Sequence, residues 1–208
     1  MAYVLHAGAP LARARAAAIL LHGRGAEAQG MVALADAFEQ GDVAYLAPQA
    51  PGHSWYPYSF LAPLEQNEPY LSQALAIVDA ALDHLAGARF TPERVALIGF
   101  SQGGCLTLEY VARHAKRYGA VAGLSAGLIG PPGTPRDYAG SLTGTPVFLG
   151  CSDIDSHVPL ARVHESRDVL TKLGAAVTER IYPRMGHTVN AEEIAQVSAL
   201  LAGIAAMP

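Results

Sequence analysis

The sequence has few cysteines, little charge and no long apolar run, and each shortage excludes a class of protein. Two cysteines, Cys105 and Cys151, are too few for a disulfide framework among 208 residues, so we expect a reducing, cytoplasmic location. Charged residues make up only 15% of the chain and leave a net charge of −4, which offers no basic surface for nucleic acid. We also expect no membrane span, because no apolar stretch is long enough to cross a bilayer.

Metal-binding patterns are also missing. The histidines and carboxylates show no ligand spacing of the H-E-x-x-H kind, so we expect neither a metal ion nor a cofactor. Asp153, Asp155 and His157 stand close together in one loop and could imitate a metal cluster. We do not expect these three residues to bind a metal ion.

Strand patterns alternate with helical patterns along the chain. Most of the expected strands are short apolar runs, typical of strands buried on both faces. They cover residues 3–6 (a weak edge strand), 16–21, 43–46, 95–98, 120–124, 147–150 and 176–182. Apolar residues recur at helical spacing in residues 31–38, 68–86, 160–173 and 194–204. This alternation predicts one α/β domain over residues 1–208: a mostly parallel central sheet with helices on both faces and no separate cap domain.

The segment Val95–Leu106 is expected to organise the active site. An apolar strand runs directly into Gly99-Phe-Ser-Gln-Gly103, which fits the G-x-S-x-G nucleophile elbow. A strand that turns abruptly into a helix strains its central residue, and glycines two positions to either side leave room where a Cβ would clash. Ser101 is therefore the predicted nucleophile. The alternative is an ordinary glycine-rich turn with an incidental serine.

Two later loops supply the partners that a serine nucleophile needs. The loop 150–159 contains Asp153 and Asp155, and the loop 183–188 contains His187. Serine, aspartate and histidine thus occur in the chain order of α/β-hydrolases, each at the carboxyl end of a different expected strand. Histidine takes the serine proton, and the carboxylate fixes the imidazole tautomer. From the residues alone, either aspartate can fill the third position.

Two earlier loops are candidates for the rest of the site. The glycine-rich turn 21–26 is expected to present free backbone N–H groups that suit an oxyanion. The alternative is an ordinary strand–helix turn, which has the same sequence pattern. His22 is expected to fix this turn rather than to act as a base. The loop 49–67 concentrates aromatic and apolar residues. We expect its side chains either to bind the substrate or to cap the core beneath the loop, with the following as the candidate binding residues: Trp55, Tyr56, Tyr58, Phe60 and Leu61.

Four segments together resemble the phospholipase/carboxylesterase family of α/β-hydrolases, whose relatives include the acyl-protein thioesterases. They are Leu21-His-Gly-Arg-Gly-Ala26, Gly99-Phe-Ser-Gln-Gly-Gly104, Asp155-Ser-His-Val-Pro159 and Gly186-His187. The likeness covers essentially the whole chain. Residues 53–60 look unlike the corresponding segment of the eukaryotic thioesterases, so the resemblance implies the bacterial branch that acts on small esters.

The resemblance also implies a role for each site residue. Ser101 would be the nucleophile, Asp155 rather than Asp153 the acid, and His187 the base. The backbone N–H groups of Arg24 and Gln102 would form the oxyanion hole.

The expected function is a serine hydrolase that cleaves carboxylic esters, or thioesters, through an acyl-enzyme. Two alternatives remain open: a perhydrolase or lactone hydrolase with the same triad, and a non-catalytic small-molecule receptor built on this fold. The second would usually lack a member of the triad, whereas all three are present here. The expected partner is a small-molecule ester. The sequence leaves open the natural ester and whether the chain forms a homodimer.

Overall fold

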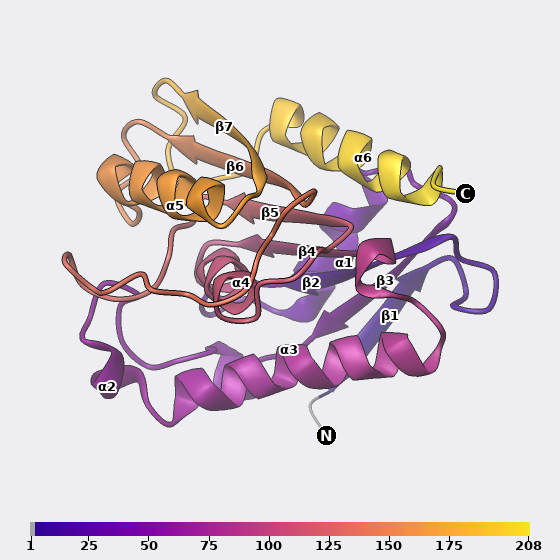
Figure 1. Ribbon diagram of the computed structural model, residues 1–208, viewed down its shortest axis with the longest axis horizontal. Helices are drawn as coiled ribbons and strands as arrows, with labels where there is room; N and C mark the ends of the chain where they lie inside the picture. Colours follow the sequence, from indigo (N-terminus) through magenta and orange to yellow (C-terminus); the bar gives the residue numbers. More distant parts are fainter. Residues whose placement is uncertain (1–2) are drawn as a thin grey trace.

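A seven-stranded sheet runs through the middle of the structure, a computed structural model that describes residues 3–208 (Figure 1). The strands are β1 (Val4–Gly8), β2 (Ala16–Leu21), β3 (Val43–Pro48), β4 (Val95–Phe100), β5 (Ala120–Leu124), β6 (Pro146–Ser152) and β7 (Ala176–Tyr182). Their order across the sheet is β1-β3-β2-β4-β5-β6-β7. All neighbours are parallel except β1, which pairs with β3 in the antiparallel direction. The predicted mostly parallel α/β-hydrolase sheet is confirmed.

Helices cover both faces of the sheet. They are α1 (Ala28–Asp36), α2 (Leu64–Asn67), α3 (Tyr70–Gly87), α4 (Gln102–Arg113), α5 (Leu160–Lys172) and α6 (Ala191–Ala205), with 3₁₀ turns η1 (Pro51–His53) and η2 (Pro92–Arg94). Helices α3, α4 and α5 pack on one face, and α1 and α6 pack on the other. Within residues 3–208, no helix has both the length and the apolar character that a bilayer crossing needs.

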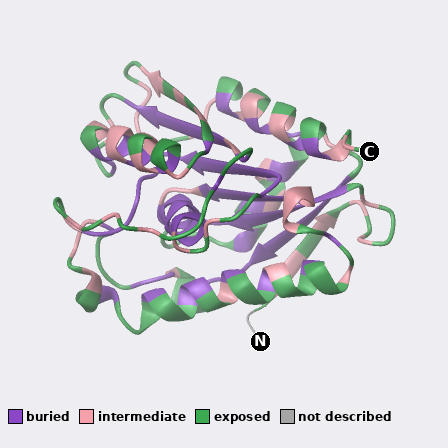
Figure 2. Cartoon of the chain, in the orientation of Figure 1, coloured by how far each residue is buried: buried purple, intermediate pink, exposed green. Residues whose placement is uncertain are grey.

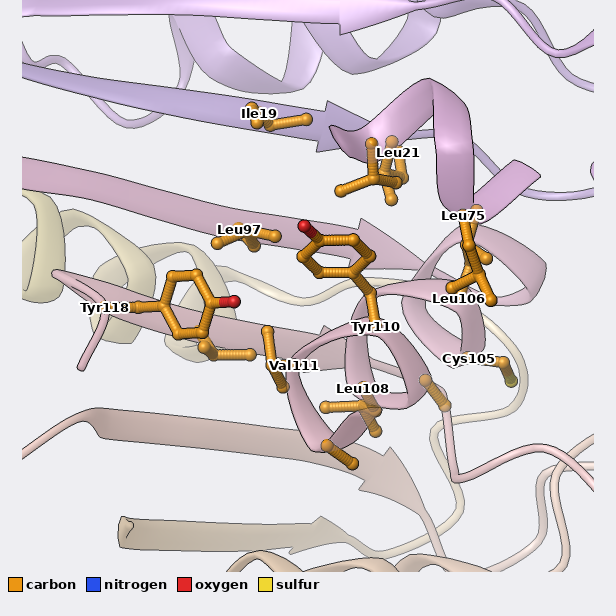
Figure 3. Close-up of a cluster of buried hydrophobic side chains, with 14 of the residues drawn as sticks. Ile19, Leu21, Leu75, Leu97, Cys105, Leu106, Leu108, Tyr110, Val111 and Tyr118 are labelled. Carbon is orange, nitrogen blue, oxygen red and sulfur yellow. The ribbon is translucent and has the colours of Figure 1, made fainter. Parts of the chain in front are cut away.

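Strand β2 shows why a continuously apolar run becomes a central strand. Successive side chains of a strand point to opposite faces of the sheet. Ile19 and Leu21 accordingly belong to the apolar cluster under α3 and α4 (Figure 3), whereas Ala18 and Leu20 belong to the cluster under α1 and α6. Both faces are covered, so every residue of β2 is buried (Figure 2).

The elements differ from the sequence prediction mainly in the long segments. The predicted loop 49–67 contains the turn η1 and the short helix α2. The long segment between β5 and β6, which is rich in proline and glycine, contains no helix and no strand of the sheet. Asn190 caps α6: its side chain accepts from Glu193 N–H at 2.9 Å, and the Glu193 carboxylate accepts from Asn190 N–H at 2.9 Å.

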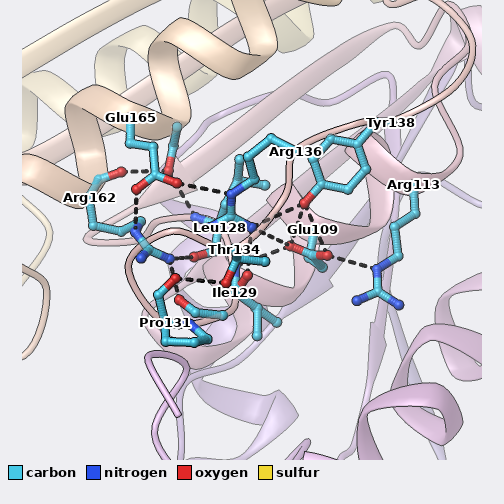
Figure 4. Close-up of polar contacts among 12 residues, drawn as sticks. Glu109, Arg113, Leu128, Ile129, Pro131, Thr134, Arg136, Tyr138, Arg162 and Glu165 are labelled. Atoms are coloured by element: carbon cyan, nitrogen blue, oxygen red, sulfur yellow. Dashed lines mark hydrogen bonds and ion pairs between the residues drawn. The ribbon is translucent and has the colours of Figure 1, made fainter. Parts of the chain in front are cut away.

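A buried group of charged side chains fastens the long β5–β6 segment to the helices (Figure 4). The Glu109 carboxylate on α4 accepts from Ile129 N–H at 3.1 Å and from the Tyr138 hydroxyl at 3.1 Å. The Arg162 guanidinium on α5 donates to the carbonyl of Gly130 at 2.6 Å. Gly130 N–H donates in turn to the carbonyl of Phe60 at 2.7 Å. The segment between β5 and β6 therefore fixes residues 49–67, the aromatic loop, at Phe60.

Candidate active site

Ser101 stands at the turn between β4 and α4 with strained backbone angles. Its φ of 54° and ψ of −122° lie outside the regions that L-residues favour. A Cβ on Gly99 would overlap the carbonyl of Gly103, and a Cβ on Gly103 would overlap the carbonyl of Leu21. The two glycines therefore allow the close approach of strand and helix that the sharp turn requires.

The structure brings Ser101, His187 and Asp155 into one hydrogen-bonded chain. His187 Nε2 lies 2.8 Å from Ser101 Oγ, and His187 Nδ1 lies 2.7 Å from Asp155 Oδ2. The three residues follow β4, β7 and β6, whose carboxyl ends lie at the same edge of the sheet. The neighbouring Asp153 instead accepts from the backbone N–H of Arg184 at 2.7 Å, and it contacts neither His187 nor Ser101 through a hydrogen bond.

Asp155 is held in the ionised form. Its side chain is 0% exposed. Burial by itself would raise the pKa of this carboxyl, but hydrogen bonds from His187 and from the N–H groups of His157 and Val158 outweigh burial and lower its pKa. An anion fixed in this way orients the imidazole, because Nδ1 must carry the proton to donate to it. Nε2 is then free to accept a proton from Ser101.

Two backbone N–H groups are candidates for an oxyanion hole, one in the elbow and one in the turn after β2. Gln102 is the first residue of α4, and the first N–H groups of a helix have no partner within the helix. Among residues 3–208, neither the Gln102 N–H nor the Arg24 N–H donates to a protein acceptor. Both N–H groups are therefore available to an oxyanion, and the Gln102 group lies at the positive end of the α4 dipole.

His22 fixes the turn that carries Arg24, as expected. It is buried, its Nδ1 lies 2.7 Å from the carbonyl of Gly23, and its Nε2 accepts from Ala50 N–H at 3.0 Å. Burial lowers the pKa of His22 and keeps the ring neutral. Both ring nitrogens are used within the fold, so His22 has no nitrogen left to act as a base.

A cavity of about 490 Å³ opens directly over Ser101. Its walls come from the turn after β2, the aromatic loop after β3, the elbow, and the loops after β6 and β7: Gly23, Arg24, Ala26, Tyr56, Pro57, Tyr58, Ser59, Phe60, Phe100, Ser101, Gln102, Cys105, His157, Val158 and His187. Three of the five residues predicted to bind substrate are among them, and Trp55 and Leu61 are not.

Trp55 belongs to the core and not to the cavity wall. Its side chain is 2% exposed, and its indole N–H donates to the carbonyl of His22 at 2.8 Å. The Gln102 side-chain carbonyl accepts from Trp55 N–H at 3.0 Å, which turns the segment inward beside the elbow. For Trp55 the alternative of core packing therefore fits the structure, because the polar atom of its ring is satisfied inside the fold.

Several cavity residues were not singled out for this role from the sequence. The His157 ring lies 4.7 Å from the His187 ring, measured between ring centroids. In the sequence, only the position of His157 two residues after Asp155 indicated that it would lie near the site. Cys105 also lines the cavity, but burial raises the pKa of its thiol to about 12, so it stays a neutral packed side chain. The Arg24 guanidinium projects to the aromatic loop, which no sequence spacing would indicate.

A model of the phospholipase/carboxylesterase family matches residues 8–204. The chain belongs to this family. The resemblance read from the four sequence segments is thereby confirmed. A phospholipase/carboxylesterase from Dyadobacter fermentans has a similar structure, with a TM-score of 0.93, 39% identity and 97% coverage of both chains.

Curated relatives point in the same direction. The chain is 34% identical over 116 residues to acyl-protein thioesterase 1 of Gibberella zeae, covering 53% of this chain and 48% of that protein. It is 24% identical over 200 residues to carboxylesterase SOBER1 of Arabidopsis thaliana, covering 87% of each chain. The first match thus spans about half the length of the relative.

Proposed function

We propose that this protein is a serine hydrolase that cleaves carboxylic esters, thioesters among them, through an acyl-enzyme. The observation that carries the proposal is the unbroken chain from Ser101 Oγ through His187 to the buried Asp155 carboxylate. Relatives named carboxylesterase and acyl-protein thioesterase support the same class of reaction. The cavity over Ser101 gives a small ester room to reach the hydroxyl.

The proposed reaction has two halves. Ser101 Oγ attacks the ester carbonyl carbon while its proton passes to His187 Nε2, and the N–H groups of Arg24 and Gln102 stabilise the oxyanion. The bond from the carbonyl carbon to the leaving oxygen or sulfur then breaks, and His187 returns the proton to the leaving group. In the second half, His187 takes a proton from water, the resulting hydroxide attacks the acyl-enzyme, and Ser101 recovers its proton.

The alternatives are less well supported. A non-catalytic receptor has no need of a serine in a strained elbow, hydrogen-bonded to a histidine that a buried carboxylate orients. A perhydrolase or lactone hydrolase would use the same three groups, and only the acceptor or the cyclic substrate would differ. Turnover of linear esters in water, compared with lactones and with hydrogen peroxide as acceptor, separates these activities.

The decisive experiment combines active-site labelling with a nucleophile variant. A fluorophosphonate probe should label the wild type on Ser101, identified by peptide mass spectrometry, and should not label Ser101→Ala. The alanine variant should keep its melting temperature and lose about 10⁴-fold in kcat on p-nitrophenyl esters. Ser72→Ala, an exposed serine on α3, is the matched control and should behave as wild type. Retention of a tenth of wild-type kcat by Ser101→Ala would rule out this nucleophile.

A further inference from the structure

The Arg24 side chain is fixed on the wall of the cavity. Its Nη1 donates to the carbonyl of Pro57 at 2.7 Å, and its Nη2 donates to the carbonyl of Tyr58. The guanidinium carbon lies 5.9 Å from the centre of the Tyr56 ring. These contacts hold a long, flexible side chain in one position, so little further entropy is lost when it binds a ligand.

Nothing in the described structure neutralises this charge. Carbonyl oxygens are neutral acceptors, and none of the ion pairs among residues 3–208 involves Arg24. The buried Arg162, by contrast, pairs with Glu165 at 3.0 Å. No aspartate or glutamate lines the cavity among the described residues, although the whole chain carries a net charge of −4. The guanidinium has five N–H donors, of which the two carbonyls use two.

The topology places Arg24 on the side of Ser101 away from His187. Arg24 follows β2 and the aromatic loop follows β3, whereas His187 follows β7, and β4 with its elbow lies between these strands in the sheet. The leaving group must receive its proton from His187 and therefore lies on the β7 side. The acyl part of the substrate then lies on the opposite side, where Arg24 is located.

We propose that Arg24 makes the cavity selective for esters or thioesters whose acyl part carries a carboxylate, such as half-esters of dicarboxylic acids. This inference rests on the proposed ester hydrolysis and names its substrate class. A planar guanidinium with free N–H donors matches a carboxylate, and a site with no acidic side chain in its walls does not repel one. Because Arg24 is exposed, its contribution is below that of a buried pair and amounts to roughly tenfold in affinity.

The competing explanation is that Arg24 only supports the aromatic loop through the two carbonyls. The two explanations differ in one measurable quantity. A supporting role affects every substrate alike, whereas anion recognition affects only the charged one. The test therefore compares two esters of equal size and equal leaving group: the p-nitrophenyl half-ester of adipic acid, and the same compound with a carboxamide in place of the free carboxylate. The adipic chain avoids the rapid cyclisation of shorter half-esters.

In the wild type, kcat/KM should be higher for the carboxylate than for the carboxamide, and added salt should reduce this ratio. In Arg24→Gln the ratio should fall about tenfold, mainly through KM, and should lose its salt dependence. Arg13→Gln removes the same charge from an exposed position outside the cavity wall and should keep the wild-type ratio. An unchanged ratio in Arg24→Gln, with both esters slowed equally, would overturn the proposal in favour of loop support.

Two further measurements test which part of the substrate Arg24 recognises and whether it binds the anion without turnover. With p-acetoxybenzoate and p-acetoxybenzamide, whose charge difference lies in the leaving group, the ratio should not respond to Arg24→Gln; a response there would overturn the acyl-side assignment. Calorimetric binding of free adipate to Ser101→Ala, weakened about tenfold when Arg24→Gln is added, needs no turnover. The binding experiment therefore distinguishes a failure of anion recognition from a failure of ester hydrolysis. Equal affinity of adipate for Ser101→Ala with and without Arg24→Gln would overturn the proposal.

Discussion

The two sides of the cavity are built differently. On the β6–β7 side, Asp155 and His187 contribute side chains that are joined by a 2.7 Å hydrogen bond. On the β2–β3 side, the turn after β2 contributes a backbone N–H, and the aromatic loop contributes apolar walls. The side chains that move the proton are therefore concentrated on one side. The other side offers a backbone N–H, apolar surface and the Arg24 guanidinium, which face the substrate.

The difference extends to burial. The Asp155 side chain is 0% exposed and accepts hydrogen bonds on both oxygens, whereas Tyr58 on the opposite wall is 57% exposed. A buried, fully hydrogen-bonded carboxylate leaves no room for adjustment, whereas an exposed ring can shift with the substrate. We expect substitutions on the β6–β7 side to act on kcat. On the β2–β3 side, we expect substitutions that change only a side chain to act mainly on KM and substrate choice, and substitutions that remove a backbone N–H to act on kcat.

The largest expected effect separates the two aspartates of the loop after β6. Asp155→Asn should lower kcat by about 10⁴-fold, because an amide facing His187 Nδ1 favours the wrong imidazole tautomer. Asp153→Asn should cost only a few-fold, because its hydrogen bond to Arg184 N–H holds the loop and an amide oxygen can replace it. Steady-state kinetics on one p-nitrophenyl ester measures both. Equal losses would show that the contact with His187 does not define the acid.

The next effect tests whether Arg24 works through its backbone. Arg24→Pro removes the N–H and should lower kcat by roughly 10²-fold or more. Arg24→Ala keeps the N–H and loses only the side chain, so the loss on a small neutral ester should stay below about tenfold. Circular dichroism and melting temperatures check that both variants fold. If alanine is as damaging as proline, the backbone assignment is wrong and the guanidinium carries the whole effect.

Features that depend on residue identity could be predicted from the sequence, whereas features that depend on backbone geometry could not. The G-x-S-x-G pattern located Ser101, and the chain order of serine, aspartate and histidine located the other two loops, because these features depend on residue identity. The choice of Asp155 over Asp153 needed the family resemblance. In the structure it follows from backbone geometry: Oδ1 of Asp155 is turned to the N–H groups of His157 and Val158, which leaves Oδ2 for His187.

The aromatic loop could not be resolved from composition. Trp55, Tyr58 and Phe60 look alike as apolar rings, but their neighbours decide their places. Trp55 turns inward because its backbone N–H donates to the side-chain carbonyl of Gln102 and its indole N–H donates to the carbonyl of His22. Contacts between residues 33 and 47 positions apart carry no local signal in the chain. The short helix α2 was missed for a related reason: four residues are too few to show a period.

The third prediction contrasts two rings of this loop. Trp55→Ala should destabilise the fold by about 3–5 kcal/mol, because it empties a buried site and leaves the His22 carbonyl without its donor. Tyr58→Ala should leave the melting temperature nearly unchanged and shift KM or the preferred acyl chain length by a few-fold. Thermal denaturation and a chain-length series of p-nitrophenyl esters measure the two outcomes. A stable Trp55→Ala variant with an altered substrate profile would show that the indole lines the cavity.

The smallest expected effect lies beneath the β6–β7 side, at Glu193 on α6. This side chain is 0% exposed; Oε2 accepts from Asn190 N–H, and Oε1 has no hydrogen-bond partner among the described residues. Burial, assisted by the charge of Glu192, raises the pKa of Glu193 from its ordinary 4.5 to about 7. Between these two values the folded protein holds a proton that the unfolded chain has released. The stability that this proton contributes is present below the lower value and is lost as pH rises through about 7.

Glu193→Gln should remove this dependence, because the amide oxygen can still accept from Asn190 N–H and the side chain no longer ionises. Between pH 5 and pH 8, the melting temperature of the wild type should therefore fall by a few degrees more than that of the variant, about 2–4 °C for each kcal/mol. Glu65→Gln, an exposed carboxylate on α2 that takes no part in the pKa shift of Glu193, is the control and should keep the wild-type slope. Parallel slopes for wild type and Glu193→Gln would mean that the carboxylate is ionised in the folded state throughout. The β6–β7 side would then contain a second buried charge besides that of Asp155, and it would differ still more from the open β2–β3 side.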